Sequence, residues 1–177
     1  MSHIPKIAVI GAGNAAENIL EIAHSVGSAI AEQSYHLVCG GKAGVMEAAC
    51  RGFRFARNEL NTNRVVAIGV LPEETADFVN EFVDIAIPTG MGVARNVLIT
   101  RMADGIIAVG GGSGTLSEIA LGWQLGKPIA ALAHSGGWSE QLAGTSIDDS
   151  LRDPVYAAEN AADAMRFIRG KLSAGLQ

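Results

Sequence analysis

Short apolar runs rich in β-branched residues alternate along the chain with longer segments whose apolar positions recur at helical spacing. The short runs predict strands, and they cover residues 7–10, 36–39, 64–70, 82–87, 105–109 and 128–132. The longer segments predict helices at residues 15–32, 43–57, 92–103, 116–126 and 157–172. We interpret residues 73–81 as an acidic loop and residues 134–150 as an irregular surface segment.

Several of these strands are apolar on both faces and are separated by helices, which predicts a parallel sheet covered by helices on both sides. The fold class is therefore α/β, with one doubly wound, Rossmann-like sheet. No repeat, low-complexity tract or linker interrupts the chain, so we expect residues 1–177 to form a single domain. Ligands of such sheets bind beyond the carboxyl ends of the strands, where the strand order reverses.

Composition narrows the classes of function. Hydrophobic residues make up 49% of the 177 residues and charged residues 18%, which excludes a disordered chain and favours a homo-oligomer. The net charge is −5 and no run of Lys or Arg occurs, so no nucleic-acid partner is expected. No apolar run is long enough for a membrane helix and no signal sequence is visible, so we expect no membrane partner and a cytoplasmic location. Cys39 and Cys50 match no metal-binding spacing, which predicts free buried thiols and no metal site.

The first glycine-rich loop follows the strand at residues 7–10 and contains Gly11, Gly13 and Asn14. Its G-x-G-x-x-A pattern allows a phosphate to approach the amino end of the next helix, or it forms only a tight turn. NAD binding also requires an acidic residue at the end of the second strand. Cys39 and Gly40 occupy that end, so NAD is not expected as a cofactor.

The second loop contains Gly40, Gly41, Lys42 and Gly44. Its glycines leave backbone amides free to face a ligand, and Lys42 either adds a positive charge or is simply solvated. The loop is not a P-loop, because no glycine lies five positions before Gly41 and no Ser or Thr follows Lys42.

The third loop offers the strongest candidate for binding an anion. Small residues lead directly into a helix, where free amides and the helix dipole favour a phosphate; they are Gly111, Gly112, Ser113, Gly114 and Thr115. The spacing of Thr115 and Glu118 also fits a capping box, which is a purely structural alternative for Glu118.

Arg95 lies in the first turn of the helix predicted at residues 92–103. A cation gains nothing from the dipole at that end of a helix. Arg95 therefore forms either a surface salt bridge or a bidentate contact with an anionic ligand.

Taken together, these residues resemble the Lonely Guy and "lysine decarboxylase-like" superfamily. The similarity rests on Gly40-Gly41-x-x-Gly44-Val45-Met46, on Arg95 and Asp104, and on Gly-Gly-x-Gly-Thr-x-x-Glu at residues 111–118. The resemblance implies a Rossmann-like fold and a homodimer or homotetramer. It also implies hydrolysis of the N-glycosidic bond of nucleoside 5′-monophosphates, with Arg95 and Glu118 at the catalytic positions. It does not imply pyridoxal phosphate as a cofactor.

Three positions depart from the enzymes' pattern and disfavour hydrolysis, namely Gly110 for the motif proline, Ala94 for a glutamate and Asn96 for a lysine. The segment Pro88-Thr89-Gly90-Met91-Gly92-Val93-Ala94-Arg95 is similar to the branch that includes the molybdenum cofactor carrier proteins. This similarity adds Thr89 and Gly90 to the expected ligand-binding residues, and it implies binding of the phosphate-bearing molybdenum cofactor, molybdopterin, without chemistry. A binding protein is therefore the favoured function, and a nucleotide phosphoribohydrolase is the alternative.

Overall fold

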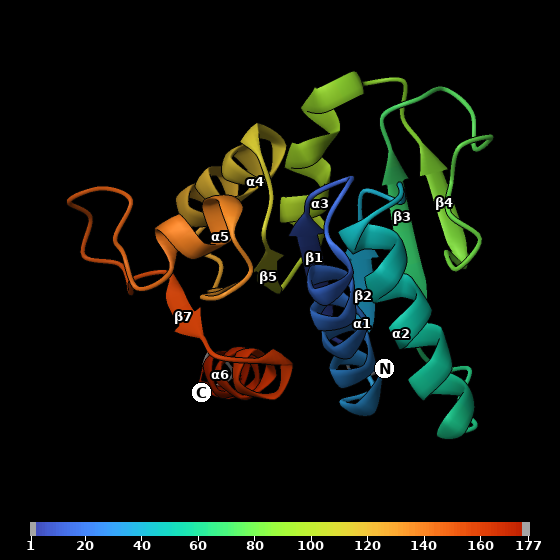
Figure 1. Ribbon diagram of the computed structural model, residues 1–177, viewed down its shortest axis with the longest axis horizontal. Coiled ribbons are helices and arrows are strands. Elements are labelled where there is room, and N and C mark those ends of the chain that lie inside the picture. Colours follow the sequence, from blue (N-terminus) through green and yellow to red (C-terminus); the bar gives the residue numbers. More distant parts are fainter. Residues whose placement is uncertain (1–2, 175–177) are drawn as a thin grey trace.

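The computed structural model describes residues 3–174 and contains one sheet of seven parallel strands with helices on both faces (Figure 1). The strand order is β4-β3-β2-β1-β5-β6-β7, so β4 and β7 form the two edges. This confirms the predicted α/β, Rossmann-like class. The strands are β1 (Lys6–Gly11), β2 (His36–Cys39), β3 (Ala67–Leu71), β4 (Ile85–Pro88), β5 (Gly105–Val109), β6 (Ile129–Leu132) and β7 (Tyr156–Ala158).

Alternate strand residues pack into two separate cores, one on each face of the sheet. In β1, Ile7 and Val9 belong to the core under α1 (Glu17–Glu32), α2 (Val45–Glu59) and α6 (Ala161–Ala174). The neighbouring residues Ala8 and Ile10 belong to the opposite core. The helices on that second face are α3 (Asn96–Met102), α4 (Ser113–Gln124) and α5 (Gly137–Leu142). The central strands are apolar on both faces because both faces are covered.

The strand order reverses between β1 and β5, which are neighbours in the sheet. From β1 the chain continues through α1 to β2 on one side, and from β5 it continues through α4 to β6 on the other. The loops after β1 and β5 therefore diverge and leave a crevice at the carboxyl ends of these strands.

Two predicted elements differ from the structure at the C-terminal side. The helix expected at residues 157–172 is preceded by β7, which pairs with β6, and α6 begins only at Ala161. The Tyr-Ala-Ala sequence of β7 has no strand signal of its own, so tertiary pairing overrides its local preference. The segment expected to be irregular contains the short helix α5.

The first residues of two helices also differ from those that the sequence predicts. The helix expected from residue 116 begins at Ser113, and residues Gly92–Arg95 form a 3₁₀ turn, η1, before α3.

Cys39 and Cys50 are buried and unbridged, with their Sγ atoms 3.6 Å apart. Within residues 3–174, no helix is both long enough and apolar enough to cross a membrane.

Candidate functional site

A cavity of about 350 Å³ lies at the carboxyl edge of the sheet, at the point where the strand order reverses. All three glycine loops contribute to its wall, together with η1 and α3. Of the residues singled out in the sequence, those that line the cavity are Gly11, Gly13, Gly40, Arg95, Gly112, Ser113, Gly114, Thr115 and Glu118. The fold thus brings together residues that lie more than 100 positions apart in the chain.

The amino end of α4 provides free backbone donors to this cavity. The residue before the helix, Gly112, has no side chain to cap it, and the first bond of the helix runs from the Leu116 amide to the Gly112 carbonyl. The amides of Ser113, Gly114 and Thr115 consequently have no hydrogen-bond partner among the described residues. Such amides, with the positive end of the helix dipole, favour an anion.

Arg95 lies at the end of η1 and is held on one side only. Its Nη1 donates to Oε1 of Glu118 at 3.2 Å and to Oδ1 of Asn96. Its Nε is buried and, like Nη2, has no partner within the described part of the chain. A Cβ atom at Gly40 would lie 2.5 Å from Nη2, so only a glycine leaves room for the guanidinium. Nη2, which is not buried, therefore offers a charged donor to an oxyanion at this edge of the cavity.

Glu118 is buried against Arg95, and the capping-box interpretation is wrong. Because α4 begins at Ser113, Thr115 lies inside the helix and cannot cap it. The ion pair with Arg95 is also not a surface salt bridge, since the two side chains are only 12% and 8% exposed. Burial raises the pKa of the Glu118 carboxyl from 4.5 to about 7, while Arg95 opposes this rise by favouring the ionised form. Near neutral pH, Glu118 therefore exists in both protonation states.

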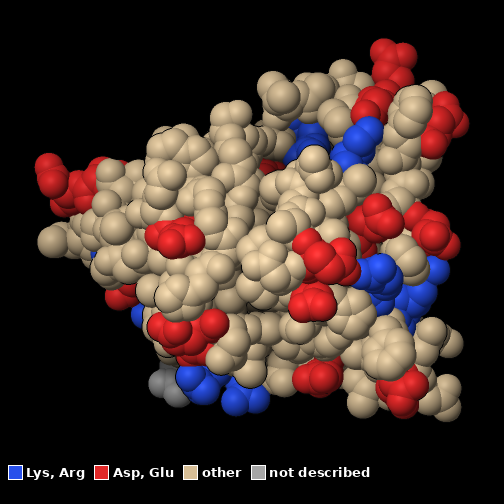
Figure 2. Space-filling view, in the orientation of Figure 1, with Lys and Arg blue, Asp and Glu red and all other residues tan. Residues whose placement is uncertain are grey.

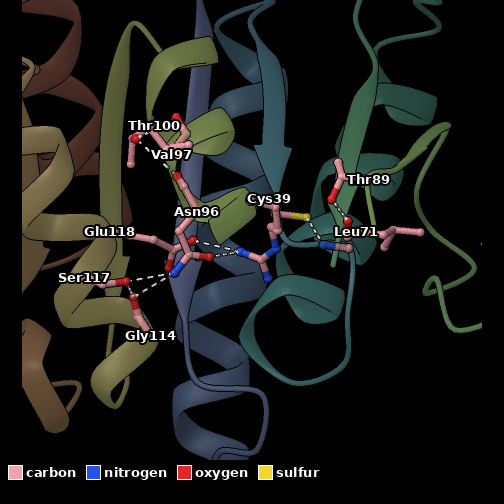
Figure 3. A network of polar contacts seen from close by, with 11 residues as sticks. Cys39, Leu71, Thr89, Asn96, Val97, Thr100, Gly114, Ser117 and Glu118 are labelled. Atoms are coloured by element: carbon pink, nitrogen blue, oxygen red, sulfur yellow. Dashed lines mark hydrogen bonds and ion pairs between the residues drawn. The ribbon is translucent and has the colours of Figure 1, made fainter. Parts of the chain in front are cut away.

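Asn96 is a central polar residue of the site. In the sequence it stands out only as a departure from a family pattern. Its Oδ1 accepts the hydrogen bond from Arg95, and its Nδ2 donates to Oγ of Ser117 at 2.8 Å. Ser117 in turn donates to the carbonyl oxygen of Gly114 at 2.7 Å. Figure 3 shows Asn96 facing Gly114, Ser117 and Glu118 across the gap between α3 and α4. Asn96 thus fixes Arg95 relative to the first turns of α4.

Seven residues expected in the site do not line the cavity, and four of them have other surroundings. Asn14 is exposed, and Gly90 lies beside Glu74 with a φ of 64°. Thr89 donates its hydroxyl to the carbonyl oxygen of Leu71 at 2.7 Å. The ammonium group of Lys42 lies 2.5 Å from a carboxylate oxygen of Glu73, which neutralises its charge locally.

The remaining expected residues, Gly41, Gly44 and Gly111, shape the loops from behind the cavity wall. All three have positive φ angles, which favour glycine. The carbonyl oxygen of Gly111 accepts a hydrogen bond from the Trp138 amide of α5 at 3.0 Å. Ser135 similarly accepts one from the Gly110 amide at 2.8 Å. The segment at residues 134–150 therefore supports the third glycine loop, a role for which its sequence carries no signal.

Comparison with known proteins identifies a family to which the chain is similar. The model of the SLOG cluster4 family matches residues 4–165. An uncharacterized protein of Archaeoglobus fulgidus is 43% identical over 127 residues, which cover 72% of this chain and 79% of the relative.

Two solved structures are similar over nearly the whole chain. The molybdenum cofactor binding protein of Rippkaea orientalis has a TM-score of 0.83 and 32% identity, covering 97% of this chain and 99% of that one. The molybdenum cofactor carrier protein of Chlamydomonas reinhardtii has a TM-score of 0.80, with the same identity and coverage. The resemblance inferred from the sequence motifs is confirmed.

Proposed function

Because the chain belongs to the SLOG cluster4 family, we propose that it binds a phosphate-bearing small molecule in the cavity at the carboxyl edge of the sheet. We further propose that this ligand is the molybdenum cofactor and that the protein carries it without altering it. The names of the two similar structures, at 32% identity, support this choice of ligand.

The observation that carries the proposal is the unpaired Nη2 of Arg95 in the same cavity as the uncapped end of α4. Arg95, whose Nη2 has no partner within residues 3–174, and the residues of the first turn of α4 line the same cavity. The net charge of the chain is −5, so the overall field does not attract anions. Figure 2 shows acidic side chains spread over the face drawn, with basic side chains gathered in a few places. An anion would therefore be attracted by the hydrogen-bond donors of this cavity and not by the electrostatic field of the whole protein.

The residues of this cavity fit the phosphate end of the molybdenum cofactor. Arg95 and the amides of Ser113, Gly114 and Thr115 would hold the phosphate, because charge-assisted donors are the strongest partners of such oxygens. The cofactor supplies its own dithiolene ligands to molybdenum. The protein therefore has only to bind and shelter it.

Titration with molybdopterin under anaerobic conditions, followed by pterin fluorescence, tests the proposal. Losing a charge-assisted hydrogen bond costs about 1.5–3 kcal/mol, so Arg95→Ala should weaken binding roughly 10- to 150-fold. Arg101→Ala removes the same charge from an exposed position of α3 and should bind as the wild type does. Equal affinity of the wild type and Arg95→Ala would contradict the proposal.

One observation favours a nucleotide phosphoribohydrolase as the second candidate. Glu118 lines the cavity with a pKa of about 7, a value suited to a general base near neutral pH. In that function Glu118 would deprotonate the attacking water and Arg95 would bind the phosphate. Release of free base from several nucleoside monophosphates distinguishes the two functions. Turnover by the wild type that falls roughly 100-fold or more in Glu118→Gln would establish the hydrolase.

A further inference from the structure

A second and larger cavity, of about 770 Å³, lies on the opposite edge of the sheet from the candidate phosphate site. Its wall includes Pro5, Asp104 and Pro128, which stand just before the amino ends of β1, β5 and β6. The cavity is completed by the end of α4, by α6 and by the loop that leads into β7. That loop projects from the molecule between α5 and β7 (Figure 1). The proposed function uses none of these residues.

The inner wall of this second cavity is apolar. Trp123, Ile129 and Val155 contribute side chains that are 3%, 4% and 1% exposed, and α6 adds Phe167 and Leu172. A cavity of this volume with aromatic and branched walls has the size and character of sites that bind small organic molecules. The apolar wall therefore fits the body of such a ligand.

The charged groups around the cavity leave an excess of positive charge. Asp104 is paired with His3 at 2.9 Å, and Asp153 is paired with Lys171 at 2.6 Å. Lys127 and Arg152 form no ion pair within residues 3–174, although Arg152 donates a hydrogen bond to the carbonyl oxygen of Trp123. Two cations that lie outside the ion pairs at an apolar cavity favour an anionic group on the ligand.

The indole of Trp123 adds a buried donor to the same wall. Its Nε1 is buried and has no close hydrogen-bond partner among the described residues. Hydrogen bonds from Ser150 lower the pKa of the nearby Asp148 carboxyl, and smaller contributions come from hydrogen bonding by the indole and from the charge of Arg152.

We propose that this second cavity binds an organic anion that has an aromatic or branched aliphatic body and a single acidic group. The body packs against Trp123 and Phe167, and the acidic group faces Lys127 and Arg152. The site differs in chemistry from the phosphate cavity, whose wall is built from glycines and backbone amides. The two proposals are independent of each other.

Titration with 8-anilinonaphthalene-1-sulfonate, an aromatic anion, tests this second site through its fluorescence. We expect saturable binding of one molecule per chain. Lys127→Glu and the double variant Lys127→Glu/Arg152→Glu should weaken binding at least tenfold, since each replaces attraction with repulsion. The side chain of Lys127 makes no hydrogen bond in the described structure, and its backbone amide donates to the carbonyl oxygen of Gly122, so the single variant does not depend on an intact loop around Arg152. Arg51→Glu, on the exposed surface of α2, is the matched control and should bind as the wild type does.

Further measurements separate this site from its alternatives. Binding should persist in Arg95→Ala and should not be displaced by inorganic phosphate. Three results would overturn the proposal: unchanged affinity in both charge-reversal variants, loss of binding in Arg95→Ala, or binding that disappears as the chains associate at high concentration. The last result would mean that a second copy of the chain covers the cavity.

Discussion

At the scale of single residues, anion binding at the candidate site depends on how the side chain of Arg95 is held. A buried ion pair contributes little net stability, because desolvation of both charges offsets their attraction. Arg95 and Glu118 nevertheless lie buried together, and the buried Nε of Arg95 lacks a partner in the described structure. A buried charged pair of this kind at the wall of a cavity is typical of a ligand site.

Asn96 should act as a positioning residue for Arg95. Asn96→Ala removes the acceptor that orients the guanidinium, so we expect phosphate binding to weaken about 3- to 30-fold, which corresponds to about 0.6–2 kcal/mol. Isothermal titration with a phosphate ester measures this change. Asn18→Ala, at an exposed position of α1, is the control. Unchanged affinity in Asn96→Ala would show that Arg95 is oriented without Asn96.

The pH dependence of anion binding should report the ionisation of Glu118. Sulfate is a suitable probe, because its own charge is constant near neutral pH. As the pH rises through about 7, Glu118 becomes negative, repels the anion and competes for Arg95, so affinity should fall. Glu118→Gln should remove this dependence. A wild-type affinity that stays flat between pH 6 and pH 8 would contradict the raised pKa.

The same group should make stability depend on pH. The pKa of Glu118 in the folded protein, about 7, lies above its usual 4.5. The protonated form therefore contributes stability that is fully present below pH 4.5 and is lost as the pH rises through 7. Urea denaturation should show this fall in the wild type and not in Glu118→Gln.

The sequence predicts which residues make up the site better than it predicts how those residues contact one another. Arg95, Glu118 and the glycines before α4 can be found from residue type and spacing. The role of Glu118 cannot be found in this way. A capping box can be assigned only when the first residue of α4 is known, and the helix starts three residues earlier than its apolar pattern indicates. The part played by Asn96 depends on α3 and α4 lying side by side, which only the tertiary structure determines.

At the scale of elements, the first turn of α4 should separate stability from binding. A Cβ atom at Gly114 would meet nothing within 4 Å, and Gly114 lines the cavity. Gly114→Ala should therefore stabilise the folded protein by up to about 1 kcal/mol, through the better helix propensity of alanine. The added methyl group should also weaken phosphate binding several-fold by entering the cavity. Gly170→Ala, at an open position of α6, is the control that should change stability alone.

Close contact between α1 and α2 depends on glycine. A Cβ atom at Gly52 would lie 2.0 Å from the carbonyl oxygen of His24, and backbone atoms cannot move aside as a flexible side chain can. Gly52→Ala should destabilise the protein by about 1–3 kcal/mol in urea denaturation. Gly170→Ala should instead be neutral or stabilising. Equal effects of the two substitutions would contradict the observed packing of α1 on α2.

The alternation of strands and helices could be predicted because both cores follow simple periodicities. The strand β7 could not be predicted, because its three residues become a strand only by pairing with β6. The supporting role of α5 was also missed, since its contacts to Gly110 and Gly111 are made through backbone atoms.

At the scale of the whole molecule, we expect the chain to form a homo-oligomer. Only 18% of its residues are charged, and apolar side chains remain exposed around η1, with Val93 87% and Met91 43% accessible. Since Val93 also lines the phosphate cavity, a copy packed there would help to close the site. Light scattering at micromolar concentration should give a mass of a dimer or a tetramer. A mass near 18.3 kDa would contradict this expectation.

The central claim is that Arg95 and the amino end of α4 hold the phosphate group of a small molecule. The most direct measurement is native mass spectrometry of the protein purified under mild, anaerobic conditions from cells that make the molybdenum cofactor. The account predicts a phosphorus-containing ligand on the wild type and little or none on Arg95→Ala. A wild type that carries no such ligand, or equal occupancy of the two proteins, would contradict it.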